Sequence, residues 1–206
     1  MALLAACVAA MAMTGIRFAG YGLPGWLDAA FGPRIEAHLG RFPVLVNWLP
    51  DVGTLEPVAA MTLALILACA VTRRWRGAVL AVAAVPIAIG LTEYVLKPSV
   101  GEAIGQAFPS GHATSMFALA ASCAVLLANP PRRRVPGGVR LLLVLMAVLL
   151  AVGVASAMVA NGAHSFTDAV AGAAVGTGVV LACALTLDGL GTLPRPEPPV
   201  PPPPAG

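Results

Sequence analysis

The sequence predicts an all-α integral membrane protein, built as a bundle of six transmembrane helices. Hydrophobic residues make up 59% of the 206-residue chain and charged residues only 10%, whereas a soluble domain averages about 25% charged residues. A helix needs about 20 apolar residues to cross a bilayer, so the first apolar segment is short for a span and the other five fit. The six segments lie near residues 2–16, 55–72, 77–96, 111–128, 139–160 and 167–187.

The first apolar segment is interpreted as a membrane helix rather than a secretory signal peptide. No basic region precedes it, and Arg17 follows the apolar run instead. Residues 1–187 then form one transmembrane domain. The Pro-rich stretch at 188–206 is predicted to be a disordered cytoplasmic tail.

Residues 19–53 form an extracytoplasmic or interfacial segment that mixes apolar and charged side chains. One interpretation is a helix lying along the membrane interface, with Trp26 and Trp48 at the level of the lipid headgroups. The other is a plain connecting loop that packs over the bundle. The sequence alone leaves both open.

The basic residues indicate which ends of the helices face the cytoplasm. The turns TRRWRG and NPPRRRVPGGVR carry most of them, so the predicted topology has eight basic residues on one side and four on the other. Cytoplasmic loops carry the excess of Lys and Arg. Both termini are therefore predicted to be cytoplasmic in a multi-pass protein of the cell membrane. The small net charge of +3 gives no reason to expect a nucleic-acid partner.

Two further patterns favour structural roles. No pair of cysteines has metal-ligand spacing, so they are predicted to be small core residues and neither a metal nor a cofactor is expected. Glycines in the last two apolar segments predict close helix packing. The cysteines are Cys7, Cys69, Cys123 and Cys183, and the glycines are Gly153, Gly172, Gly176 and Gly178.

Polar residues that remain near lipid are costly and are functional candidates by default. Lys97 ends the third apolar segment, and the tetrapeptide 109–112 (PSGH) opens the fourth. His164 and Asp168 stand at the start of the sixth. The predicted topology places all of these helix ends on the outer face, so they are expected to form one site.

One half of this site suits an anion such as phosphate. Ser110 is a good N-cap, and Gly111 lets a ligand approach the backbone closely. Two helix N-termini would supply N–H groups and positive dipole ends, and Lys97 adds a point charge. Glu93 lies one helical turn before Lys97, which favours a local ion pair between them.

The other half suits nucleophilic catalysis. His164 and Asp168 are four residues apart and share one helix face. A carboxylate beside an imidazole holds it in one tautomer and activates it as a nucleophile, and His112 could protonate a leaving oxygen. Together the two halves indicate phosphoester hydrolysis through a phospho-His intermediate.

Lys97, PSGH at 109–112 and the HxxxD element ending at Asp168 resemble the motifs KxxxxxxRP, PSGH and SRxxxxxHxxxD of the type 2 phosphatidic acid phosphatase superfamily. The resemblance covers roughly residues 55–187 and implies a six-span fold that hydrolyses a lipid phosphate or pyrophosphate without a metal. By position it implies three catalytic residues and three phosphate ligands. The catalytic residues would be His164 as nucleophile, Asp168 as its partner and His112 as general acid; Lys97, Ser110 and Gly111 would bind phosphate.

Both motif arginines are missing from this chain. Seven residues after Lys97, where the family pattern has Arg-Pro, the chain has Ile104 and Gly105. Where the third motif has Ser-Arg, the chain has Ala157 and Met158. Arg suits bidentate phosphate recognition, and each lost charge-assisted bond costs about 1.5–3 kcal/mol. Replacement by Arg34 or Arg41, from the outer segment, is one way to complete the site.

Two functions are therefore weighed. The first is a membrane phosphatase that acts on a polyprenyl or phosphatidyl phosphate at the extracytoplasmic face, with the lipid tail in the bilayer. The alternative is a catalytically degenerate relative that binds lipid headgroups or supports a membrane partner. A transporter is disfavoured because the spans carry neither mid-membrane charges nor broken helices.

Overall fold

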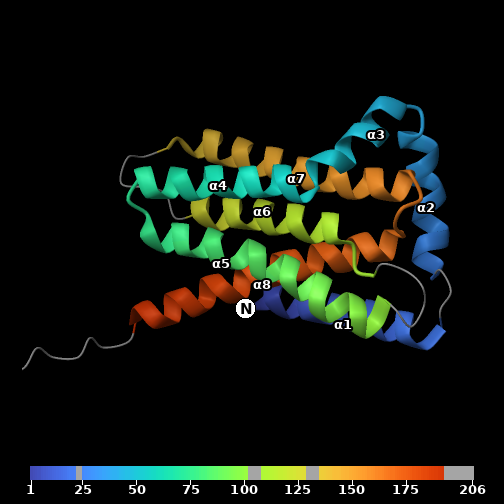
Figure 1. Cartoon of the computed structure of the whole chain (residues 1–206), viewed down its shortest axis with the longest axis horizontal. Helices are drawn as coiled ribbons and strands as arrows, with labels where there is room; N and C mark the ends of the chain where they lie inside the picture. The colour runs from blue at the N-terminus through green and yellow to red at the C-terminus, as the bar shows by residue number, and fades with distance from the viewer. Residues whose placement is uncertain (22–24, 102–107, 129–134, 193–206) are drawn as a thin grey trace, which may run out of the picture.

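The computed structural model describes residues 1–21, 25–101, 108–128 and 135–192, and its regular elements are all helical (Figure 1). The predicted all-α class is confirmed. In chain order the elements are α1 (Ala2–Tyr21), α2 (Trp26–Leu39), α3 (Pro43–Val52), α4 (Leu55–Val71), α5 (Trp75–Leu91), the π-helix η1 (Thr92–Gly101), α6 (Gly111–Ala128), α7 (Gly137–Ala160) and α8 (Phe166–Thr192).

All six apolar segments are helical, but fewer than six qualify as complete spans. Among the described residues, four helices are long and apolar enough to cross a membrane: Trp75–Ser99, Gly111–Ala128, Gly137–Ala160 and Phe166–Leu190. The pair α3 and α4 passes the same test jointly, as a fifth span bent by 59°. Ala2–Gly15 of α1 is a shorter apolar helix. The multi-pass helical fold is confirmed, with four or five spans supported by length and composition.

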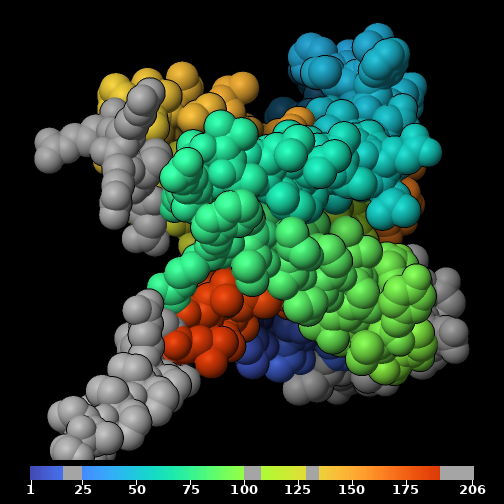
Figure 2. All heavy atoms as spheres, turned by 60° about the vertical axis from the view of Figure 1, so that its left-hand side comes forward, coloured from blue at the N-terminus to red at the C-terminus, as the bar shows by residue number. Residues whose placement is uncertain are grey.

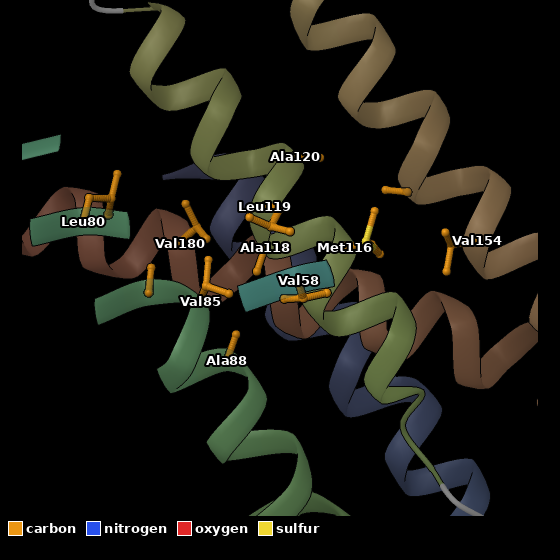
Figure 3. Packing of buried hydrophobic residues seen from close by; sticks show 12 residues of the cluster. Val58, Leu80, Val85, Ala88, Met116, Ala118, Leu119, Ala120, Val154 and Val180 are labelled. Atoms are coloured by element: carbon orange, nitrogen blue, oxygen red, sulfur yellow. The ribbon is translucent and has the colours of Figure 1, made fainter. Parts of the chain in front are cut away.

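α6 lies at the centre of the bundle. It packs against α5, α7 and α8, and α1 covers the other side of α8 (Figure 1). The main hydrophobic cluster draws one or more side chains from each of five helices (Figure 3). Val58 of α4, Val85 of α5, Leu119 of α6, Val154 of α7 and Val180 of α8 are all buried there. Because lipid is as apolar as these side chains, close packing holds such helices together.

The contact between α6 and α8 depends on two glycines, as predicted. A Cβ at Gly172 would overlap the carbonyl oxygen of Ser110 and lie 2.9 Å from the Cβ of Ala113. A Cβ at Gly176 would overlap the carbonyl oxygen of Thr114 and lie 2.9 Å from the backbone nitrogen of Ala118. The two backbones approach so closely that only glycine fits, and this approach sets the position of the start of α6 beside α8.

Residues 26–52 of the outer segment form two helices that pack over the bundle. α2 lies against α7 and α8, and α3 lies against α7 (Figure 1). The segment is helical, as in the first interpretation, and it packs over the bundle, as in the second. Trp26 and Trp48 keep 65% and 73% of their surface exposed.

A buried carboxylate fastens α2 to the first turn of α8. Asp28 is only 8% exposed, and its Oδ1 accepts hydrogen bonds from the backbone N–H (2.8 Å) and the hydroxyl (2.9 Å) of Thr167. The rings of Phe31 and Phe166 stack beside it with centroids 4.8 Å apart. Asp28 thus satisfies an N–H group at the N-terminus of α8, where a negative charge is favourable.

α8 continues to Thr192, past the predicted boundary at residue 187. The helix ends shortly before Pro194, which disfavours helical geometry at the preceding residue. The proposed tail at 193–206, Arg132, Arg133 and Arg134 of the basic turn, and Ile104 and Gly105 lie outside the described residues.

We expect Gly176→Ala to destabilise the protein by about 1–3 kcal/mol, because its new methyl group would meet backbone atoms of α6 that cannot move aside. The matched control is Gly90→Ala in α5, where a Cβ would meet nothing within 4 Å. The thermal unfolding midpoint in detergent measures both. A midpoint for Gly176→Ala equal to that of Gly90→Ala would contradict the close approach of α6 and α8.

Asp28→Ala should also lower the unfolding midpoint, since it leaves the buried N–H of Thr167 without a partner, at a cost of about 1–3 kcal/mol. Glu36→Ala in the same helix is the control, because Glu36 is exposed. If the two variants unfold at the same temperature, Asp28 does not hold α2 on α8.

Candidate active site

The candidate site lies where α6 and α8 begin and α7 ends, at one end of the bundle (Figure 1). Two backbone hydrogen bonds fix these three chain segments. The N–H of Ser110 donates to the carbonyl of Asp168 over 3.2 Å, and the N–H of His164 donates to the carbonyl of Met158 over 3.1 Å. The second and third predicted motif elements are therefore joined through their main chains.

Ser110 caps α6, as the sequence predicted. Its Oγ accepts a hydrogen bond from the N–H of Ala113 over 3.3 Å, and the residue is 1% exposed. Its carbonyl accepts from the hydroxyl of Thr114 (2.9 Å), whose oxygen in turn accepts from the hydroxyl of Thr92 (3.1 Å). These buried bonds connect the start of α6 to the start of η1, the helix that carries Lys97.

Asp168 and Ser165 form a capping box at the start of α8. The N–H of Asp168 donates to Oγ of Ser165 (3.1 Å), and the N–H of Ser165 donates to Oδ2 of Asp168 (2.9 Å). Two N–H groups of the helix terminus are satisfied in this way. Oδ2 of Asp168 therefore has a structural role, while Oδ1 is left for another partner.

His164 and Asp168 form the buried pair that the HxxxD spacing predicted. Nδ1 of His164 lies 3.4 Å from Oδ2 of Asp168, and the side chains are 9% and 3% exposed. This is ion-pair distance but not hydrogen-bond geometry. Among the described residues, neither Nδ1 of His164 nor Oδ1 of Asp168 has a hydrogen-bond partner. Catalytic hydrogen bonds are often long without substrate and tighten when it binds.

Lys97 lies at this site, where it is paired with the carboxylate of Glu93. Its Nζ lies 2.6 and 2.7 Å from the two carboxylate oxygens of Glu93, so the predicted local ion pair is present. The pair rests against the backbone of Gly111, where a Cβ would overlap Oε1 of Glu93 and lie 3.5 Å from Nζ of Lys97. Because Gly111 has no side chain, other groups can approach its backbone closely. Here the side chains of Glu93 and Lys97 do so.

His112 is half-buried at the first turn of α6 and packs against the bend between α3 and α4. A Cβ at Gly53 would lie 2.9 Å from Cδ2 of its ring. The groups that act on this ring electrostatically are His164, Lys97, Glu93 and Asp51. The two histidines and Lys97 thus belong to one cluster.

Sequence reasoning missed the contributions of Gly53, Asp51 and Asp28. Gly53 and Asp51 reach His112 only because α3 and α4 are bent against each other, and no motif surrounds them. Asp28 offered one signal, since an acidic residue in an apolar segment needs a buried partner. No spacing rule connects it to Thr167, which lies 139 residues further along.

Arg34 and Arg41 were weighed as replacements for the missing motif arginines. Arg34 and Arg41 are exposed, and in the described part of the chain no hydrogen bond or ion pair joins either guanidinium group to the cluster. Met158 occupies the position of the third-motif arginine, is 7% exposed and contributes its carbonyl to His164. Within the described ranges, no group of three or more His, Cys, Asp or Glu side chains could hold a metal ion.

Comparison with known proteins agrees with this geometry. Residues 92–190 match the family model of the PAP2 superfamily, from the start of η1 almost to the end of α8. The matched segment contains all six predicted site residues. No curated protein and no solved structure matches the chain. Residues 92–190 thus belong to the PAP2 superfamily, the type 2 phosphatidic acid phosphatase superfamily that the Lys97, PSGH and HxxxD elements resemble.

Proposed function

We propose that this protein is a membrane phosphatase that hydrolyses a lipid phosphate or pyrophosphate. Its family and its apolar helices support a phosphatase-type function at a membrane. The observation that carries the proposal is the buried His164–Asp168 pair, in which one polar atom of each side chain lacks a partner among the described residues. Such atoms are costly to bury, and a substrate that tightens the pair relieves the cost.

In the proposed reaction Nε2 of His164 attacks the phosphorus atom and the bond to the leaving oxygen breaks. His112 gives a proton to that oxygen, and Asp168 stabilises the imidazolium that forms on His164. His112, now neutral, takes a proton from water, which attacks the phospho-His. Inorganic phosphate leaves and His164 is regenerated. Lys97, Ser110, Gly111 and the free N–H groups of the α6 terminus would hold the phosphate.

A lipid substrate fits the position of the site at the end of the bundle. There the phosphate reaches water while the hydrocarbon chain stays in the bilayer. Arg73, Arg74, Arg76 and Arg140 lie at the opposite end of the helices, and cytoplasmic ends carry the excess of basic residues. The proposed orientation therefore places the site on the extracytoplasmic face and both termini in the cytoplasm, in the cell membrane.

His164→Ala should abolish phosphate release from a lipid phosphate in detergent micelles, by at least about a thousandfold, because removal of a nucleophile leaves only binding and charge effects. Arg34→Gln is the control at the same end of the bundle, since its side chain is exposed. Wild-type protein quenched during turnover should also carry an acid-labile phosphoryl group that the variant lacks. Equal phosphate release by wild type and His164→Ala would rule out this mechanism.

The second candidate is a degenerate relative that binds lipid headgroups without hydrolysing them. Two observations favour it: Glu93 neutralises the charge of Lys97, and Met158 replaces a phosphate-binding arginine. Lipid binding without phosphate release, unchanged by His164→Ala, would support this candidate over the phosphatase.

Glu93→Gln tests how the ion pair affects an active enzyme. The variant frees the charge of Lys97 for the substrate, and we expect KM to fall by roughly tenfold, which corresponds to about 1.4 kcal/mol. Glu56→Gln, at an exposed carboxylate in the first turn of α4, is the matched control. A rise in KM would instead mean that Glu93 holds Lys97 in its binding position.

A further inference from the structure

A cavity lies at the end of the bundle opposite His164. It has a volume of about 580 Å³ and is enclosed by the turn between α4 and α5 and by the C-terminal parts of α6 and α8. Figure 2 brings this end forward and shows the α4–α5 turn reaching the red C-terminal part of α8. There Arg76 donates a hydrogen bond to the carbonyl of Leu187. The cavity is thus lined by elements that are distant in the sequence.

The rim of this cavity is strongly basic. Arg73, Arg74 and Arg76 all line it, and Asp188 is the one acidic residue among its lining residues, so positive charge is in excess by two. Arg76 and Asp188 are 3.5 Å apart with side chains 61% and 77% exposed. An ion pair this exposed is weak, so Arg76 and Asp188 hold each other only loosely.

The floor of the cavity is apolar. Leu80, Leu126 and Leu187 line it from three different helices. Trp75 stands among the arginines and is 65% exposed, as is typical of a side chain at the headgroup level of a membrane. A cavity with a basic rim and an apolar floor fits an amphipathic anion better than a free inorganic one.

The backbone of Arg73 has an unusual conformation for a residue with a side chain. Arg73 has φ of 56°, in the left-handed region where helix ends usually place glycine. Its N–H donates to the carbonyl of Ala70 (2.9 Å), and the N–H of Arg74 donates to that of Cys69 (2.7 Å). A glycine would adopt this conformation at lower cost. The side chain of Arg73 thus costs the turn some stability, and it lines the cavity.

We propose that this cavity binds the phosphate headgroup of an anionic phospholipid, with Arg73 and Arg74 on the phosphate and an acyl chain over Leu80 and Leu126. Basic pockets between membrane helices suit such headgroups, and arginine suits phosphate. The site is separate from the His164 cluster and does not depend on whether that cluster is catalytic. The phosphate group could also come from a free anion, so the experiment includes both sources.

The test measures thermal unfolding of the full chain in nanodiscs of phosphatidylcholine with and without phosphatidylglycerol, a phosphodiester. Wild type should unfold at a higher temperature with phosphatidylglycerol. Arg74→Gln should lose at least half of that shift. Arg73→Gly should lose as much, yet unfold at a higher temperature than wild type in phosphatidylcholine alone, because the turn is relaxed. A purely structural role for Arg73 would not produce both effects.

Arg140→Gln is the matched control, because Arg140 lies at the same end of the bundle but does not line the cavity. This variant should keep the full shift. Loss of the shift in it would mean that phosphatidylglycerol acts through the overall positive charge of this end of the bundle, and would overturn the proposal. Equal shifts in wild type and both cavity variants would overturn it as well. Glycerol phosphate and inorganic phosphate should give no shift, and an arginine-dependent shift with either would assign the cavity to a free anion instead.

Discussion

The close approach of α6 and α8 is the constraint on which the site depends. Gly172 and Gly176 bring the two backbones together, and at the end of that contact the N–H of Ser110 reaches the carbonyl of Asp168. In lipid the hydrophobic effect does not select which helices pair, so close packing at small residues selects the helix neighbours. The glycines set the α6 terminus beside the start of α8, and the side chains of both motifs follow from that placement.

The charge balance of the site differs from that of a strong phosphate receptor. Lys97 is accompanied by Glu93, and Asp51 and Asp168 add further negative charge around the histidines. Phosphate binding would then rely on backbone N–H groups and on displacement of one carboxylate. A site of this kind suits weak binding of a substrate that the membrane already concentrates, whereas it suits a dilute soluble phosphate poorly.

The sequence predicted the helical class, the helix positions and the meeting of Lys97, the PSGH tetrapeptide and the HxxxD pair, because apolar runs and i,i+4 spacing are local signals. It did not predict how the outer segment packs, since Asp28 and Gly53 act over long sequence distances. It also predicted six spans, because each apolar segment was judged by itself. Ala2–Gly15 is too short to qualify as a span, and α4 qualifies only together with α3, across a bend of 59°.

Because Asp168 is part of the capping box at the start of α8, its presence in a sequence does not show that the protein is catalytically active. Asp168 closes a helix terminus whether or not any chemistry takes place, and so a relative that had lost catalysis would still be selected to keep it. An aspartate at this position is therefore uninformative when active and inactive members of a lineage are sorted. In the part of the chain that the structure describes, the imidazole of His164 closes no helix terminus, so its loss or retention is the better record of function.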